Sequence, residues 1–535
     1  MTPSAGTQST ETDVLIVGGG PIGLTASIGL SRFGVDTVLV NQRAATSRHP
    51  RARFIDVRTI EIFHQLEVAD AVIETALPPE WVQSVRYSTT WAEPEVFRLP
   101  TDSYHSVPRS TSPTIPVMTS QDLVEPILLD AARSYDPADV RFATEIVALD
   151  EHAGGCRAII ADVDTGEESV VEAQYVIGAD GRSSTVRDLI ASDVDSSFAG
   201  RMRVQDVLLE ADLSPWLGDR IGALLFVNHP RGYGLFQPVD ARHRFRAQCT
   251  TFRPHVDHDD VTDEHRLDWI RSAIGDEAGE AEIEIISRSS WQPEARLSDL
   301  FRRGRVFLAG DAAHTLMPTG GYGMNLGYHG VHNLVWKLAY VLHGWSDPSI
   351  LDTYETERRP QADRTRHASV RNAMLAGELY ATHDRGEPLD DVVHRLRQYG
   401  NFEGMILGAE YDSDLVHPDP GPAPVVDDDI IDFVPCVRPG RRAPHVWLDE
   451  GGDRSVLDCF GKDFIVLAGP HADPMIQRSV DELARAGVPI RAEEMASSTG
   501  DLYPEHQAFV VRPDGIVAAR VRGATIPPLH LKGQR

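Results

Sequence analysis

The feature that most constrains this chain is a glycine-rich turn between two apolar segments near its N-terminus. Residues 13–43 read DVLIVGGGPIGLTASIGLSRFGVDTVLVNQR. The pattern predicts a strand at Val14–Val17, a helix from about Ile22 to Phe33 and a second strand at Thr37–Val40. A strand, a helix and a second strand joined by such short turns form a βαβ unit, so we expect an α/β domain with a parallel sheet.

Three glycines of this turn fit the pattern GxGxxG, which binds dinucleotides in a βαβ unit. Gly18 permits the tight turn, Gly20 lets the backbone approach a pyrophosphate, and Gly23 lets the helix pack closely on the strand. The positive end of the helix dipole then faces the phosphates. The alternative is a tight turn that binds nothing. Asn41 and Gln42 stand where this pattern has an acid for the ribose hydroxyls, so we expect a weaker ribose contact.

Length, charge and cysteine content limit the remaining possibilities. The chain has 535 residues, which predicts two or three domains, and its net charge of −29 argues against nucleic acid and anionic membranes as partners. The N-terminal residues lack the features of a signal peptide, and no apolar run approaches the roughly 20 residues of a membrane span. The four cysteines form no CxxC pair and no metal-ligand spacing, so we expect a reduced, cytoplasmic location and no metal.

A second glycine-rich stretch, GDAAHTLMPTGGYGMNLG at Gly310–Gly327, follows the apolar run RVFLA. It is too rich in glycine for an ordinary helix and too long for a simple turn, so something must approach its backbone closely. The segments of interest between the two glycine-rich stretches are HPRA with Arg51, MTSQDLVEPILLDAA with Ser120 as an expected helix N-cap before Gln121, and YVIGADGRSSTVR with Asp180 and Gly181 after a strand.

The glycine fingerprint at Gly18–Gly23, the DG pair Asp180-Gly181 and the GD pair Gly310-Asp311 occur in this order, widely spaced along the chain. In these motifs the chain resembles the class A flavin-dependent aromatic hydroxylases, in particular phenol and chlorophenol hydroxylases and the tailoring hydroxylases of aromatic natural products. The resemblance covers about residues 10–400. It extends more loosely through RPGRRAPHVWL (438–448), which is similar to the start of the thioredoxin-like C-terminal domain of that subgroup.

The resemblance implies FAD as the cofactor, NADPH or NADH as co-substrate, and dioxygen. It implies a monooxygenase that hydroxylates a phenol-like aromatic or hydroxypyridine ring through a flavin C4a-hydroperoxide, in the biosynthesis of an aromatic natural product. Two alternatives stay open. One is a related flavoenzyme that performs a Baeyer–Villiger oxidation or an oxidative decarboxylation, and the other is a flavin-retaining binding protein without turnover.

The resemblance also implies roles for individual residues. Asp311 of the GD pair would bind the ribityl chain of FAD, because a carboxylate accepts hydroxyl hydrogen bonds well. The carbonyl of Pro318 would line the site of oxygen reaction, and a helix beginning near Asn325 would direct its N-terminus at the flavin. The other residues expected to contact the cofactor are Arg51, Gln121, Asp180, Gly321, Gly323, Met324 and Asn325. Asp180 could instead order the helix start behind it, and His314 is expected to be structural or to contact the flavin.

The expected fold is a Rossmann-like FAD domain with an antiparallel-sheet substrate domain and a thioredoxin-like C-terminal domain. The expected boundaries are 1–80, 118–194 and 291–400 for the discontinuous FAD domain, 81–117 and 195–290 for the substrate domain, 401–435 for a linker and 436–535 for the last domain. Alternating segments predict the substrate sheet, and its candidate substrate residues are Phe226, Tyr233, Phe236 and Gln237.

Local patterns predict parts of the C-terminal half. A helix is expected to end within YETERRPQAD (354–363), followed by further helical segments to about 400. VWLDE (446–450) and FIVLAGP (464–470) predict strands, and AFVVRPDGIVAARV (508–521) predicts a hairpin around its PDG turn. Because CxxC is absent, we expect this domain to serve packing or a homo-oligomer interface rather than redox chemistry.

The last prediction concerns Arg53. Some relatives place an Asp five residues before the RT arginine, here Arg58, where it can act as a base towards the phenol; this chain has Arg53 at that place. A cation lowers the pKa of a nearby phenol, so Arg53 would stabilise the phenolate while a His, a Tyr or water takes the proton. Tyr233 is therefore a catalytic candidate beside Arg53. The alternative is that Arg53 pairs with Asp56 or with a flavin phosphate.

Overall fold

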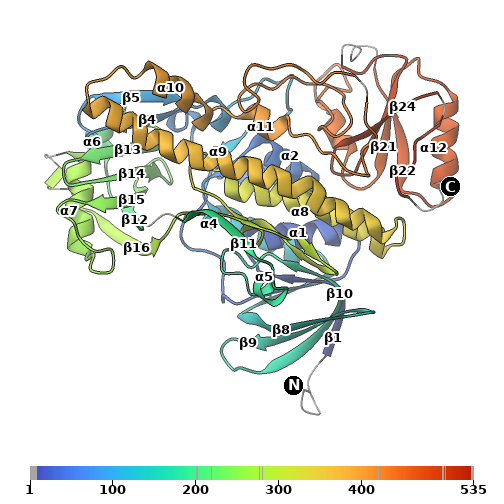
Figure 1. The fold of residues 1–535 in the computed structure, drawn as a ribbon, viewed down its shortest axis with the longest axis horizontal. Coiled ribbons are helices and arrows are strands. Elements are labelled where there is room, and N and C mark those ends of the chain that lie inside the picture. The colour runs from blue at the N-terminus through green and yellow to red at the C-terminus, as the bar shows by residue number, and fades with distance from the viewer. Residues whose placement is uncertain are drawn as a thin grey trace.

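An eight-stranded sheet forms the centre of the N-terminal part of the molecule (Figure 1). The computed structural model describes residues 9–531 apart from 200–202, 219, 276–277, 280, 420, 497–498, 500–501 and 524. The sheet order is β18-β19-β10-β1-β2-β7, with β9 paired to β10 and β8 paired to β9. The strands are β1 Ser9–Val17, β2 Thr37–Asn41, β7 Ala138–Phe142, β8 Thr144–His152, β9 Gly155–Asp162, β10 Glu168–Gly178, β18 Arg302–Arg303 and β19 Val306–Leu308. β1 is parallel to both β2 and β10, which confirms the expected βαβ unit.

The helices around this sheet are α1 Pro21–Arg32, α2 Val57–Gln65, α3 Ala69–Ile73, α4 Gln121–Arg133, α5 Thr185–Leu189, α8 Tyr322–Leu342 and α9 Thr353–Asp384. Helices α1, α4 and α5 pack on strands of this sheet, α8 packs on α1, and the long α9 runs from there towards the second sheet (Figure 1). A Cβ on Gly29 of α1 would lie 3.0 Å from Val335 of α8, so these two helices pack closely. The prediction that a helix ends within 354–363 is wrong, because α9 continues through Pro360 to Asp384. Its later turns bury Leu375 and Leu379 in a second core, which stabilises the longer helix.

The second large sheet has seven strands in the order β16-β12-β15-β14-β13-β4-β5. Its strands are β4 Ser84–Ser88, β5 Glu95–Pro100, β12 Val204–Glu210, β13 Leu224–His229, β14 Gly232–Pro238, β15 Arg244–Phe252 and β16 Glu284–Trp291. The sheet is antiparallel except for the parallel pair β13–β4. One face packs on α7 Asp263–Ile274, and the other packs on α9 and α10 Asp390–Leu396. The two faces therefore have separate cores.

Shorter strands and helices lie outside the two large sheets. They are β3 Phe54–Ile55 paired with β6 Val117–Met118, the small sheet of β11 Val194–Ala199, β17 Glu294–Ser298 and β20 His314–Thr315, and the helices α6 Ser214–Leu217 and α11 Glu403–Leu407. No helix among the described residues is long and apolar enough to cross a membrane.

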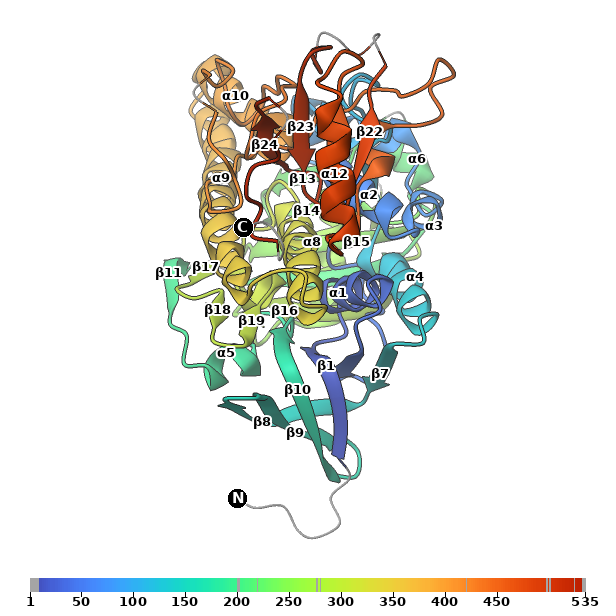
Figure 2. The same ribbon diagram turned by 90° about the vertical axis from the view of Figure 1, so that its right-hand side faces the viewer.

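The C-terminal domain contains a four-stranded sheet in the order β22-β21-β23-β24, with α12 on one side (Figure 2). Its elements are β21 Phe464–Ala468, α12 Met475–Arg485, β22 Ile490–Glu494, β23 Ala508–Val511 and β24 Val517–Val521. The parallel β21–β22 pair and the antiparallel β23–β24 hairpin give the expected thioredoxin-like arrangement. VWLDE is not a strand, because the Asp449 carboxylate accepts the N–H groups of Asp453 and Arg454 and closes a turn there. The second parallel strand is instead Ile490–Glu494.

Candidate functional site

The turn after β1 is shaped by its glycines. Gly18 has φ +112°, a conformation that favours glycine. A Cβ on Gly23 would lie 1.8 Å from the carbonyl oxygen of Gly18, so only glycine lets α1 pack this closely. At Gly20, by contrast, no described atom lies within 4 Å of an added Cβ. The backbone at Gly20 therefore faces open space at the N-terminus of α1, where a phosphate can approach the free N–H groups.

Asn41 at the end of β2 braces this turn. Its Oδ1 accepts a hydrogen bond from the Gly19 N–H at 3.2 Å, and its Nδ2 donates to the Arg43 carbonyl at 3.3 Å. An acid at this position could not make the second contact. An amide oxygen has two lone pairs, so Asn41 can brace the turn and still accept one ligand hydroxyl. Gln42 lies beside it and is exposed.

Asp311 stands just after β19, beside the start of α1. Gly310 before it has φ +58°, and a Cβ there would lie 2.9 Å from Ile22 of α1, so the GD pair approaches α1 closely. The Asp311 side chain is exposed. The surrounding protein still removes much of its hydration and raises the pKa of the carboxyl to about 6, while the positive charges of Arg182 and Arg51 act in the opposite direction. Arg51 is itself exposed and within electrostatic reach of Asp311.

The N-terminus of α8 is open in the same way as that of α1. The helix begins at Tyr322, three residues before the predicted start, after Gly321 in a left-handed conformation with φ +72°. No side chain in the described part of the chain caps it, and no described atom lies within 4 Å of a Cβ on Gly323. The N–H groups of the first turn, which includes Met324, are therefore available to a ligand. Pro318 is exposed just before this turn, and its carbonyl accepts the Gly321 N–H at 3.2 Å.

The Asn325 side chain is used within the protein. Its Nδ2 donates to the carbonyls of Phe54 at 2.9 Å and Gly321 at 3.0 Å. Its Oδ1 accepts the Asp56 N–H and the Thr59 hydroxyl, both at 2.9 Å. Asn325 therefore fastens the first turn of α8 to β3 and α2. The side chain thus has a structural role, and a contact between Asn325 and the cofactor stays a prediction.

Two other residues expected near the cofactor have clear structural partners. Asp180 accepts the Ser184 hydroxyl at 2.5 Å and the Val186 N–H at 3.1 Å, so it orders the start of α5. This contact matches the alternative interpretation of Asp180. The Gln121 N–H donates to the Ala52 carbonyl at 2.8 Å, which places the start of α4 beside the segment that carries Arg51.

Arg53 is a buried cation that makes no ion pair with the residues that the structure describes, although the carboxylate of Asp122 acts on it from a distance. Only 6% of the residue is exposed, and none of its three guanidinium nitrogens has a hydrogen-bond partner among the residues that the structure describes. Burial and the nearby Arg246 lower its pKa to about 9. The expected alternative, a pair with Asp56, is not formed, because Asp56 accepts from the Thr59 N–H and from His329 instead.

Aromatic side chains cover the α9 side of the substrate sheet. Phe226 stacks on Tyr87 with ring centroids 5.0 Å apart and an angle of 3° between the planes. Tyr233 packs edge-on against Tyr380 of α9 at 5.7 Å. Burial raises the pKa of Tyr233 above its ordinary value, so its hydroxyl is neutral and is a hydrogen-bond donor rather than a base. Tyr87 and Tyr380 were missed by the sequence argument; only the alternation within β4 could have suggested Tyr87.

Phe236 lies on the opposite face of the sheet. It is fully buried and stacks on Trp269 at 5.2 Å, with Trp91 at 4.6 Å. Successive residues of a strand point to opposite faces, so Phe236 cannot share the face of its neighbour Gln237. The Gln237 Oε1 accepts a hydrogen bond from Arg246 at 3.2 Å. The prediction of Phe236 as a substrate residue therefore does not fit this geometry.

His314 fits the structural interpretation. It is 4% exposed, and burial lowers its pKa to about 3, so the imidazole is neutral. Its backbone lies in β20, which pairs with β17. The four cysteines are free, and Cys459 is buried in the core of the C-terminal domain.

Comparisons with known proteins agree with this geometry. The family model described as "FAD binding domain" matches residues 11–369, and "Aromatic-ring hydroxylase, C-terminal" matches residues 437–532. A "Putative polyketide hydroxylase" of Streptomyces halstedii is 32% identical over 96% of this chain and 94% of its own length. A "4-methyl-5-nitrocatechol 5-monooxygenase" of Burkholderia sp is 31% identical over 97% and 95%. The crystal structure of the flavin-dependent monooxygenase PieE with FAD and substrate superposes with a TM-score of 0.87, at 30% identity over 96% of each chain.

Proposed function

We propose that this chain, which belongs to the FAD-dependent aromatic-ring hydroxylases, hydroxylates a phenol-like or hydroxypyridine ring of an aromatic natural product. As a member of the family it is a monooxygenase that uses FAD, NADPH or NADH, and dioxygen. The names of its relatives, a polyketide hydroxylase and a nitrocatechol monooxygenase, support an oxygenated aromatic substrate.

The observation that carries the proposal is the pairing of a cation with an aromatic surface. The Arg53 guanidinium is buried without a hydrogen-bond partner among the described residues, and the substrate sheet nearby presents Phe226, Tyr87 and Tyr233 on one face. Arg246 links the two, because it lies near Arg53 and donates to Gln237 on that sheet. A planar ring with an ionised oxygen would satisfy both features.

The residues around the glycine turns fit FAD. Open backbone at Gly20 suits its pyrophosphate, and the exposed Asp311 carboxylate suits its ribityl hydroxyls. The free N–H groups at Gly323 and Met324 suit negative charge on the reduced ring. When bound, FAD would supply the redox chemistry by which dioxygen becomes an electrophilic oxygen donor at the expense of NADPH or NADH. The carbonyl of Pro318 and the side chain of Arg51 would line the space beside it.

In this proposal Arg53 lowers the pKa of the substrate phenol, so that its ring carbons ortho and para to the oxygen become electron-rich. Tyr233 orients the ring by donating a hydrogen bond, because its raised pKa keeps the proton on its hydroxyl. The proton of the phenol then leaves to water or to a histidine. The packed aromatic side chains exclude water from the reacting carbon.

A substrate screen tests the proposal. Phenols, hydroxypyridines and polycyclic phenols are offered to the FAD-loaded enzyme, and NADPH and NADH oxidation and product mass are measured. Stimulated oxidation with a gain of one oxygen on a ring carbon, located by NMR, supports hydroxylation. Oxygen inserted into a carbon–carbon bond would indicate the Baeyer–Villiger alternative, and loss of carbon dioxide would indicate oxidative decarboxylation. The absence of NAD(P)H consumption with every aromatic would favour a flavin-binding protein.

Other predictions stay proposals. The domain boundaries are those expected from the sequence, with residues 401–435 as a linker. We further propose a cytoplasmic location and a homo-oligomer formed through the C-terminal domain. Gel filtration with light scattering of the whole chain and of variants on the surface of α12 tests the oligomer.

A further inference from the structure

A small cavity lies where the C-terminal domain meets α2, α8 and α11. Its volume is about 40 Å³, which is room for roughly three water molecules. Three arginines, two histidines and an asparagine contribute to its wall, and Asp514 contributes its one carboxylate among the described residues. None of the residues proposed above to bind FAD or the substrate lines it. The cavity is therefore separate from the catalytic site.

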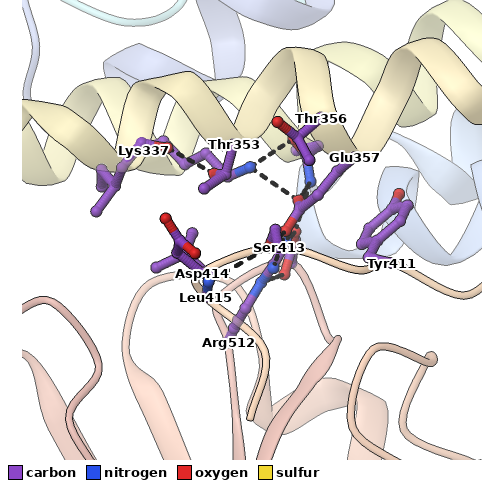
Figure 3. Close-up of polar contacts among 12 residues, drawn as sticks. Lys337, Thr353, Thr356, Glu357, Tyr411, Ser413, Asp414, Leu415 and Arg512 are labelled. Carbon is purple, nitrogen blue, oxygen red and sulfur yellow. Dashed lines mark hydrogen bonds and ion pairs between the residues drawn. The ribbon is translucent and has the colours of Figure 1, made fainter. Parts of the chain in front are cut away.

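Two carboxylates, Asp514 in the wall and Glu357 behind it, already form ion pairs with buried cations. Glu357 of α9 accepts from Lys337 at 2.8 Å, from Arg512 at 2.6 and 2.9 Å, and from the Ser413 hydroxyl at 2.7 Å (Figure 3). Asp514 accepts from the same Arg512 at 2.5 and 3.0 Å. Lys337, Glu357 and Arg512 are fully buried. These two carboxylates are thus committed to cations that lie beside the cavity.

The arginines that line the cavity are less well paired. Arg58 and Arg442 share one carboxylate, Glu61, each at 2.9 Å. Arg442 Nη1 has no hydrogen-bond partner in the described part of the chain. Arg358 donates to the Tyr411 hydroxyl at 2.6 Å, and its Nε has no partner among the described residues. Arg358 and Arg442 are each only 4% exposed.

Buried cations outnumber buried carboxylates among the described residues around the cavity. The buried cations are Arg58, Lys337, Arg358, Arg442 and Arg512, and the buried carboxylates are Glu61, Glu357 and Asp514. His332 contributes no charge, because burial lowers its pKa to about 3 and keeps the imidazole neutral. Asp56, the partner of the lining residue His329, is a further buried carboxylate, so the five cations stand against four carboxylates. A buried cation with too little counter-charge is strongly unfavourable, so an anion in the cavity would stabilise this cluster.

We propose that this cavity binds one small inorganic anion of halide size, chloride in solution, between Arg58, Arg358 and Arg442. The anion supplies negative charge where α2, α9 and the C-terminal domain meet, and so helps to hold that domain against the FAD domain. This site is independent of the substrate and of the reaction.

Bromide is the first probe of the site, because its anomalous scattering identifies it in a crystal. Crystals of the FAD-loaded enzyme are soaked in sodium bromide, and the anomalous map is examined at the cavity. We expect a bromide peak within hydrogen-bonding distance of the Arg358 and Arg442 guanidinium groups. A cavity that holds only water under these conditions overturns the proposal. This experiment needs no variant, so it stands even if a substitution prevents folding.

The second measurement is the thermal unfolding midpoint of the FAD-loaded enzyme at constant ionic strength. Replacing gluconate, which is too large for the cavity, by chloride should raise the midpoint until the site is saturated. Arg358→Met should lose this chloride-specific rise. Arg231→Met, which removes an exposed arginine from a surface ion pair, should keep it. Equal midpoints in chloride and gluconate would overturn the proposal.

Discussion

Replacing Asp311 by Asn tests whether its carboxylate binds FAD. The change keeps the size of the side chain and removes its charge. A hydrogen bond to a charged group contributes about 1.5–3 kcal/mol, so the variant should bind FAD roughly 10- to 150-fold more weakly. Gly310 beside it approaches Ile22 of α1 closely, and the substitution leaves that contact in place. The loss should therefore come from the cofactor contact and not from a change of fold.

The raised pKa of Asp311 adds a pH dependence with a defined sign. The carboxyl has a pKa of about 6 in the FAD-free protein. Ribityl hydroxyls would donate to the ionised form and lower the pKa in the complex. FAD binding by the free protein is thus at full strength above pH 6. As the pH falls below that value, binding must displace a proton, and affinity should drop by up to about tenfold per pH unit.

Quenching of FAD fluorescence by the FAD-free protein measures both effects. Titrations on either side of pH 6 should show weaker binding at the acid side for the unmodified protein. Asp311→Asn should bind weakly throughout and lose the pH step. Asp259→Asn is the matched control, because that side chain is 78% exposed on the surface. An Asp311→Asn protein with unchanged affinity, or with the pH step intact, would refute the reasoning.

The remaining predictions concern a buried cation, a buried carboxylate and two phenylalanines. Arg53→Met should hydroxylate slowly near neutral pH and recover at higher pH, where the phenol ionises unaided; a pH–rate profile with the midpoint of the unmodified enzyme would sink this role. Glu357→Gln should lower the free energy of unfolding in urea by about 3–5 kcal/mol, because two buried cations lose their partner; an unchanged midpoint contradicts it. Phe236→Ala should cost about 3–5 kcal/mol of stability with an unchanged KM, whereas Phe226→Ala should raise the KM. A raised KM in the Phe236 variant would restore the original prediction for that residue.

Local sequence patterns were sufficient to predict the helices, strands and turns that are determined by residues close together in the chain. The strand, turn and helix around Gly18 follow from apolar runs and glycine spacing within about 30 residues, as the βαβ pattern requires. The β23–β24 hairpin likewise follows from the PDG turn, in which Gly515 has φ +75°. Both elements were predicted because neighbouring residues alone decide them.

Long-range contacts decided the features that were predicted incorrectly or missed. Alternation along β14 places Phe236 and Gln237 on opposite faces of the sheet. Which face each side chain occupies becomes clear only from the helices, because α7 packs on one face and α9 on the other. The structural role of the Asn325 side chain was not predicted, because its partner Phe54 lies 271 positions away in the chain. Glu357 drew no attention in the sequence, because its partner Arg512 is 155 positions away.

The strand order of the first sheet has a consequence for the newly made chain. β1 pairs with β10, at Glu168–Gly178, and β10 in turn pairs with β19, at Val306–Leu308. At about 5–20 residues per second, roughly 15–60 s separate the synthesis of β1 from that of β19. Throughout this interval the ribosome-bound chain carries apolar strands whose sheet edges are unpaired, which are templates for aggregation. We therefore expect nascent-chain chaperones to bind it, and yields in a foreign host to rise when translation is slowed by cooling or when such chaperones are supplied.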